Sequence, residues 1–217
     1  MHASYQQVVE AFSDTGLAVR GGFERIEDEA CSLVLIGNFG AGMWAEFSAA
    51  RRNERDPLDA WTRRVTDPLA ARLGARAVYP SDRPYHPFQQ WAQRAEPVHP
   101  SPLGILIHPE HGLWHAYRAA LLFPFVVDGL PQRRETDSPC QSCISKPCLS
   151  ACPVAAFDGS SYNVAACASH LRGGADPDCA SLGCRARDAC PVAPDKRYAH
   201  DQIAFHMAAF VRSRGGP

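Results

Sequence analysis

The sequence predicts an α+β protein built in two parts. Apolar residues recur at helical spacing near the N-terminus, and short apolar runs separated by turn residues follow them. Together these patterns are typical of helices mixed with antiparallel strands. The composition then changes, because eight of the nine cysteines fall between Cys140 and Cys190. A packed mixed domain followed by a small cysteine-rich domain accounts for both observations.

The first predicted helix carries Tyr5, Val8, Val9 and Phe12 on one face, and Gly16 can end it. The apolar run at residues 31–37 then suits a buried strand.

A long helix is predicted to begin at Asp56, which can cap it, with Pro57 in the first helical position. It should run to Leu73, where Gly74 stops it. The prolines and aromatic residues of the segment 79–91 either line a pocket for a flat macrocycle or fill the core of a loop.

Two further strands are predicted at residues 103–108 and 113–123. The segment 109–112 between them, Pro-Glu-His-Gly, has the composition of a turn, so we expect an antiparallel hairpin. A C-terminal helix should dock through one apolar face made of Ile203, Met207, Phe210 and Val211.

Composition narrows the class of protein. A chain of 217 residues with 46% hydrophobic residues suits a packed globular protein, and a formal net charge of −1 gives no broad basic field for nucleic acid. We therefore expect no nucleic-acid partner. The N-terminus has no secretory pattern, and no apolar stretch reaches membrane-spanning length. A cytoplasmic protein with reduced cysteines and no membrane partner is the expectation.

A polar stretch at residues 131–138 opens with proline and holds no large apolar side chain, as a linker should. The predicted domains are therefore residues 1–130 and residues 139–217, the second including the C-terminal helix.

The cysteine-rich part carries the clearest chemistry. Eight thiolates are the number that holds two [4Fe–4S] clusters, and two of these cysteines are followed directly by proline, as in cluster-binding loops. The candidate ligands are Cys140, Cys143, Cys148, Cys152, Cys167, Cys179, Cys184 and Cys190. Two four-cysteine zinc sites or disulfides are the alternatives. Cys31, in its apolar run, is expected to be a buried core thiol.

The assignment of ligands follows the crossed pattern of two-cluster ferredoxins, in which the cysteine before proline ligates the other cluster. Cys140, Cys143 and Cys148 would then share one cluster with Cys190. The second would be held by Cys152, Cys167, Cys179 and Cys184. The spacing departs from the common run, because four residues instead of two precede Cys148, and Cys167 stands alone.

The N-terminal part resembles the MMACHC family (methylmalonic aciduria and homocystinuria type C), which processes cobalamin. The segments that carry the resemblance are residues 56–59, 78–84 and 104–118, the last being the most specific. The cysteine-rich part is similar instead to the second half of epoxyqueuosine reductases, which join a related corrinoid-binding domain to two [4Fe–4S] clusters.

These resemblances imply a nitroreductase-like domain built on an antiparallel sheet, followed by a small bacterial-ferredoxin-like domain. They imply bound cobalamin, with a flavin as the alternative because that fold commonly holds one. The implied cofactor-binding residues are His108, Pro109, Gly112, Trp114 and Arg118. Tyr79 stands where a relative has histidine, so the role of that histidine does not transfer to this chain. The resemblance leaves the use of glutathione open. No catalytic residue can be named.

The residues leave other readings open. Arg118, inside an apolar strand, either contacts a ligand or pairs with an internal carboxylate. The predicted function is an iron–sulfur redox protein that takes electrons from a flavodoxin, ferredoxin or flavin reductase and delivers them to cobalamin. The alternatives are an electron-transfer ferredoxin with a docking module that holds no corrinoid, and a cobalamin carrier with structural clusters. Modification of tRNA is less favoured, because the chain shows no basic stripe.

Overall fold

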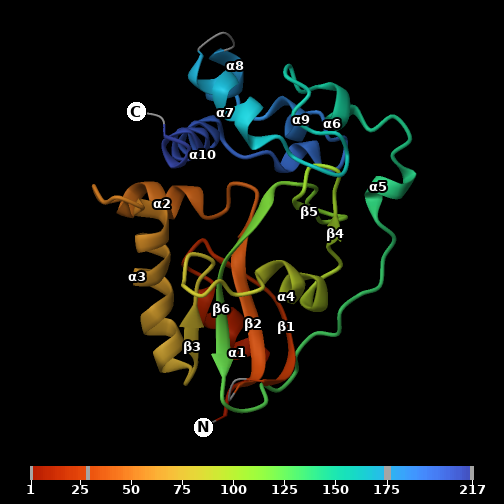
Figure 1. Cartoon of the computed structure of the whole chain (residues 1–217). Coiled ribbons are helices and arrows are strands. Elements are labelled where there is room, and N and C mark those ends of the chain that lie inside the picture. The colour runs from red at the N-terminus through yellow and green to blue at the C-terminus, as the bar shows by residue number, and fades with distance from the viewer. Residues whose placement is uncertain (1, 28–29, 174–176, 216–217) are drawn as a thin grey trace. The chain divides into compact units, whose positions relative to one another are not determined.

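The computed structural model describes residues 2–27, 30–173 and 177–215 and divides the chain into two compact units (Figure 1). Unit 1 comprises Met1–Pro97 and His115–Glu135, and unit 2 comprises Val98–Trp114 and Thr136–Pro217. These units differ from the predicted domains in one respect: the segment 98–114 belongs with the cysteines. The predicted linker, residues 131–138, has no regular secondary structure.

Unit 1 is built on a four-stranded sheet in the order β1-β2-β6-β3, with antiparallel neighbours throughout. Its strands are β1 (Ala18–Glu27), β2 (Ala30–Phe39), β3 (Arg76–Val78) and β6 (His115–Phe123). The mixed fold and the antiparallel sheet predicted from the sequence are confirmed. β1 was not predicted, because Gly21 and Gly22 interrupt its apolar pattern.

Unit 1 also contains the helices α1 (Tyr5–Phe12), α2 (Trp44–Ala50), α3 (Pro57–Arg72) and α4 (Phe88–Ala95), of which α2 packs against α3. α1 and α4 contact β1, and α3 contacts β3 and β6. The side chains from Leu33 to Ile36 in β2 are completely buried, which requires cover on both faces of the sheet. α4 begins within the segment 79–91, for which the sequence left two alternatives, a pocket lining or the core of a loop. It buries Phe88 and Trp91 in the core.

The predicted hairpin around residues 109–112 is only partly formed. His108 and Gly112 exchange two backbone hydrogen bonds of 2.8 Å. The flanking strands part after this bridge, because β5 (Leu106–Ile107) pairs with β4 (His99–Pro100), whereas β6 pairs with β2 and β3. The two sides of the turn therefore enter different units.

Unit 2 carries short helices between its cysteines: α5 (Pro139–Ser142), α6 (Pro147–Ser150), α7 (Val164–Arg172), α8 (Pro177–Ser181), α9 (Arg185–Asp188), the 3-10 turn η1 (Pro194–Lys196) and α10 (His200–Ser213). Its core joins Leu103, Ile107 and Leu113 to Phe157 and Ala186, and most of the cysteines pack around it. No helix among the described residues is long and apolar enough to cross a membrane.

Candidate functional site

Most cysteines of unit 2 lie in or beside helices of four or five residues, and Cys167 lies inside the nine-residue α7. α5 and α6 both begin with a proline at the first position, which is the place where proline costs no backbone hydrogen bond. The hydroxyl of Ser138 accepts a hydrogen bond from the backbone N–H of Cys140 and so caps α5. Lys146 adopts a left-handed backbone (φ 38°) before α6. These turns bring cysteines from distant positions in the chain towards one another.

The first group of thiols contains Cys140, Cys143, Cys148 and Cys190. Burial raises the pKa of the Cys140 thiol, and the neighbouring Cys190, Cys148 and Cys143 raise it further. Burial, then Cys190 and Cys143, raise the pKa of Cys148 in the same way. Burial, and then the neighbouring Cys143, also raise the pKa of Cys190. The ionised form of Cys140, Cys148 or Cys190 is thus disfavoured by neighbouring thiols, as expected where several sulfur atoms lie close together.

The second group lines a cavity of about 140 Å³. Its cysteines are Cys152, Cys167, Cys179 and Cys184. Mostly apolar side chains form the rest of the wall, together with Tyr162, His170 and Arg185. Burial, followed by repulsion from Cys167 and Cys152, raises the pKa of Cys184.

The two groups are the ones that the crossed assignment predicts, including Cys167, which stood alone in the sequence. Their role as cluster ligands stays a prediction. Soft thiolates in sets of four, around a space lined otherwise mostly by apolar atoms, fit an iron–sulfur cubane in both donor chemistry and number. Among the described residues, no three His, Cys, Asp or Glu side chains converge on a single point suited to one metal ion.

Two donors face the sulfurs of the second group. The backbone N–H of Ala156 donates to Cys152 Sγ at 3.3 Å. The phenol of Tyr162, which stacks on Phe157 with ring centroids 4.5 Å apart, forms a hydrogen bond with Cys167. Burial and this contact raise the pKa of Tyr162, so the phenol keeps its proton and acts as the donor.

The residues expected to bind a cofactor at the hairpin have structural contacts in unit 2. A Cβ on Gly112 would lie 2.2 Å from the carbonyl oxygen of Val192, so this loop packs backbone against backbone on the chain that follows Cys190. His108 is buried, and its Nδ1 accepts a hydrogen bond from the backbone N–H of Glu110 at 3.0 Å. Pro109, between them, is half-buried in the turn.

Trp114 is also a packing residue. It is 3% exposed, its ring lies edge-on to Tyr198 at 5.4 Å, and the guanidinium of Arg187 lies 4.2 Å from the ring centre. Arg187 in turn donates to the carbonyl of Leu113 at 2.6 Å. The hairpin motif therefore anchors the segment 98–114 on the cysteine loops, and these contacts give no residue-level support for a corrinoid site there.

Arg118 lies in unit 1, at an irregularity in the pairing of β2 with β6. Ile36 opposes Ala119 and Gly37 opposes Tyr117, which leaves Arg118 as an extra residue, a β-bulge. A Cβ on Gly37 would stand 2.1 Å from the Ala116 carbonyl oxygen, so the bulge requires glycine opposite it. Arg118 Nε donates to Asn38 Oδ1 at 3.4 Å. The bulge also interrupts the regular alternation of faces along this strand.

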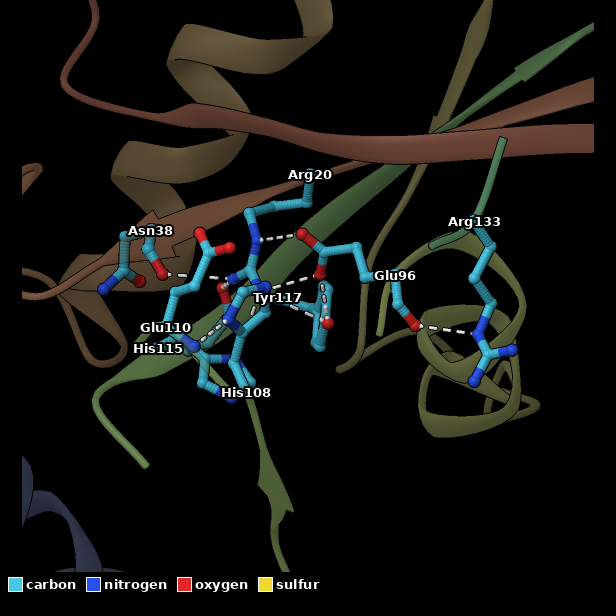
Figure 2. Close-up of polar contacts among 9 residues, drawn as sticks. Arg20, Asn38, Glu96, His108, Glu110, His115, Tyr117 and Arg133 are labelled. Carbon is cyan, nitrogen blue, oxygen red and sulfur yellow. Dashed lines mark hydrogen bonds and ion pairs between the residues drawn. The ribbon is translucent and has the colours of Figure 1, made fainter. Parts of the chain in front are cut away.

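The buried arginine–carboxylate pair of the structure is Arg20–Glu96, which sequence reasoning missed (Figure 2). Arg20 is 1% exposed and donates to both carboxylate oxygens of Glu96, at 2.9 and 2.7 Å. Tyr117 donates to the same carboxylate at 2.5 Å, and Arg20 also reaches His115 Nδ1 at 3.3 Å. Because a guanidinium cannot accept a hydrogen bond, Nδ1 of His115 is the acceptor and its ring proton lies on Nε2. An arginine within a strand was the available signal, but the strand itself was not recognised.

The chain matches no protein-family model and no curated protein sequence. Solved structures do match. Epoxyqueuosine reductase with a modified tRNA-Tyr stem loop aligns over 89% of this chain and 66% of its own, with a TM-score of 0.50 and 17% identity. The enzyme from Bacillus subtilis aligns over 89% of this chain and 66% of its own, with a TM-score of 0.52 and 17% identity. The enzyme from Streptococcus thermophilus aligns over 88% of this chain and 69% of its own, with a TM-score of 0.51 and 14% identity.

This chain has the fold of the epoxyqueuosine reductases. It spans about two thirds of their length. The resemblance stated for the cysteine-rich part is therefore supported at the level of the fold. The resemblance of the N-terminal part to the MMACHC family finds no support in any comparison.

The expectation of no nucleic-acid partner is contradicted by the first of these structures, in which a protein of this fold holds a tRNA stem loop. That expectation used the formal net charge of −1, which sums over the whole chain. Nucleic acids are bound by local groups of basic side chains, and a sum over all residues does not report such groups.

Proposed function

We propose that this protein binds two [4Fe–4S] clusters in unit 2 and acts as an iron–sulfur redox protein. The observation that carries the proposal is the cavity whose wall contains four cysteines from three stretches of chain, around residues 152, 167 and 179–184. The first group of four, in which neighbouring thiols raise the pKa of Cys140 and of Cys148, supports it independently. Fold-level likeness to epoxyqueuosine reductases agrees with this role.

Each cluster would be held by one group of four thiolates and would supply transfer of single electrons. The chain's own residues prepare this site. Leu171, Met207 and Phe210 close the second cavity with apolar atoms and exclude water, while Ala156 and Tyr162 direct N–H and O–H groups at sulfur. Hydrogen bonds to the sulfurs and low solvent access are the levers by which a protein sets a cluster's potential.

The electron acceptor in this proposal is a corrinoid, cobalamin being the example implied by the sequence resemblance. Its support is the resemblance of the cysteine-rich part to proteins that join a corrinoid-binding domain to two clusters. An electron-transfer role without any corrinoid is the alternative, because the residues of the hairpin motif have packing roles in unit 2.

Metal analysis tests the first part. Protein reconstituted with iron and sulfide without oxygen should contain about eight irons per chain, the number in two [4Fe–4S] clusters. Cys148→Ser and Cys167→Ser should each abolish one cluster and leave the other, because they belong to different groups. Zinc in place of iron, or loss of both clusters in each variant, would refute the ligand sets.

Cobalamin binding tests the second part. Added cobalamin should change its visible spectrum in the presence of the protein, and a base-off cobalt(II) signal should appear in the EPR spectrum. Dithionite should then yield cob(I)alamin in wild-type protein and not in Cys148→Ser. An unchanged cobalt spectrum would leave the electron-transfer role as the function.

A nucleic-acid substrate is a second candidate, favoured by the tRNA stem loop held by a protein of the same fold. Arg51, Arg52 and Arg55 are exposed in the segment 51–56 between α2 and α3, which with Glu54 and Asp56 carries three positive and two negative charges, a net charge of +1. A tRNA stem loop should bind more weakly as salt rises, and replacing the three arginines by glutamate should reduce the salt slope by about 2–3. Equal binding by this variant would exclude the segment.

A further inference from the structure

The cavity of the second thiol group contains an imidazole that the proposed set of ligands does not use. His170 lines this cavity together with the four cysteines. The other two polar side chains in the wall have partners that account for them. Tyr162 forms its hydrogen bond with Cys167, and Arg185 forms an ion pair of 3.2 Å with Asp178, in which the two side chains are 45% and 56% exposed. His170 is therefore the polar group of this wall that still lacks a function.

The helix α7 brings Cys167 and His170 to the same side. The two residues are three positions apart in this helix, and residues three apart are neighbours on a helix surface. Asn163 fixes the start of α7, because its side chain accepts a hydrogen bond from the backbone N–H of Ala166 at 3.0 Å. Since Cys167 and His170 line one cavity, a single helical turn presents a proposed sulfur ligand and an imidazole to the same space.

A histidine near the end of a helix is often a surface residue that interacts with the last carbonyl groups. His170 does lie in the last turn of α7, but its Nε2 atom is buried. The next residue, Leu171, is 8% exposed and also lines the cavity. The burial of Nε2 and the position of the ring in the cavity wall favour a role inside the cavity over a role at the helix end.

An imidazole in such a wall can act on a cluster without binding iron. Four thiolates already complete the protein ligands of a [4Fe–4S] cluster. The imidazole ring carries at least one N–H group whether it is neutral or charged, and this group can donate a hydrogen bond to sulfur. Sulfur carries more negative charge once the cluster has taken up an electron. The hydrogen bond is then stronger, so it favours the reduced state.

We propose that His170 donates a hydrogen bond to a sulfur of the second cluster and thereby raises the reduction potential of that cluster. This inference rests on the proposed function and adds to it a residue that controls one cluster of the two. The proton stays on the imidazole when the cluster takes up its electron, and no bond to iron forms or breaks. With Tyr162, His170 gives the second cluster two side-chain donors.

An EPR-monitored redox titration without oxygen tests the proposal on full-length reconstituted protein. His170→Phe keeps an aromatic ring and removes the N–H donor, whereas His170→Gln keeps a donor. The Cys148→Ser variant, which should retain only the second cluster, identifies the midpoint that belongs to it. His170→Phe should make this cluster about fivefold to tenfold harder to reduce, tenfold being about 59 mV for one electron. His170→Gln should lie closer to the wild-type midpoint.

His200→Phe is the matched control, because His200 is an exposed histidine at the start of α10 in the same unit. It should leave both midpoints unchanged, and His170→Phe should leave the midpoint of the first cluster unchanged. Iron analysis of each variant verifies that both clusters are present. The proposal is overturned if His170→Phe contains both clusters and titrates with the wild-type midpoints.

Pulsed EPR of the reduced wild-type protein is a second measurement, and it requires no variant to fold. Among the described residues, His170 is the only histidine in the wall of this cavity. Isotopic labelling of histidine nitrogen should therefore change a weak nitrogen coupling to the second cluster. The absence of such a coupling would overturn the proposal, and so would a strong coupling, which indicates an imidazole bound directly to iron. Failure of the proposed function looks different, because the reconstituted protein would then contain no iron–sulfur cluster.

Discussion

Gly112→Ala tests whether the segment 98–114 is part of the cysteine-binding unit. Gly112 has φ +57°, and a methyl group there would stand 2.2 Å from the Val192 carbonyl oxygen and 3.1 Å from its carbonyl carbon. The neighbour is backbone, so the loop that follows Cys190 must shift to make room. The substitution should therefore weaken cluster retention although residue 112 carries no ligand.

Gly104→Ala is the matched control for the magnitude. Gly104 has φ +73°, and among the described residues nothing lies within 4 Å of its added Cβ. In both variants, a residue with a Cβ in the left-handed conformation lowers the free energy of unfolding by about 1–2 kcal/mol. Only Gly112→Ala must also displace packed atoms, which costs about 1–3 kcal/mol more. The expected totals are about 2–5 kcal/mol for Gly112→Ala and about 1–2 kcal/mol for the control.

Urea-induced loss of the cluster absorbance, followed without oxygen, measures the difference. With a dependence on urea of about 1–3 kcal/mol per molar, the midpoint of Gly112→Ala should fall about 1 M below that of Gly104→Ala. Iron content after reconstitution should fall in the same order. Equal midpoints for the two variants would refute the close packing of this turn on the Val192 backbone.

Three further predictions concern unit 1 and the second thiol group. Arg20→Met should destabilise the protein by about 3–5 kcal/mol in thermal denaturation, because it strands the buried carboxylate of Glu96, and the double variant with Glu96→Leu should cost less than Arg20→Met alone. Tyr162→Phe removes a hydrogen bond to sulfur that is worth about 0.5–1.4 kcal/mol and stabilises the reduced state of the cluster. One midpoint in an EPR-monitored redox titration should therefore fall by about 20–60 mV. Unchanged midpoints would contradict this role. Partial burial acts to raise the pKa of Asp82, but hydrogen bonds from Arg63 and a backbone N–H outweigh it and hold the pKa below its ordinary value. Its stabilising effect is therefore present above the unfolded pKa and is lost as pH falls through the lower folded one. Asp82→Asn should cost under about 1 kcal/mol at pH 7 and should flatten the acid loss of stability below about pH 4, and an unchanged acid limb would exclude this pair.

Local sequence was sufficient for several elements. The helix α3 begins at the predicted proline and ends within one residue of the predicted end, because the preferences of proline and glycine act over a few residues. Asp56 is at the predicted N-cap position, but its side chain makes no capping hydrogen bond. The run 33–36 is a buried strand as expected. The division of the thiols into two groups of four was predicted from the crossed pattern of two-cluster ferredoxins, although the spacing departs from their common run.

Other features depend on contacts between residues far apart in the chain. Arg20 meets Glu96 across 76 positions, and nothing in either local pattern indicates the partner. The bulge at Arg118 arises from its pairing with Gly37 in another strand, so a period of two along β6 could not show it.

The amino-acid sequence by itself determined the mixed fold class, the eight-thiol set and its division into two fours, because backbone propensity and soft-ligand spacing are local properties. Only the tertiary structure decided that the hairpin at 108–114 packs with the cysteine loops and that Arg20 is buried against Glu96. The physical reason is that burial and pairing depend on contacts between segments far apart in the chain, and the local sequence of one segment does not indicate which segment packs against it.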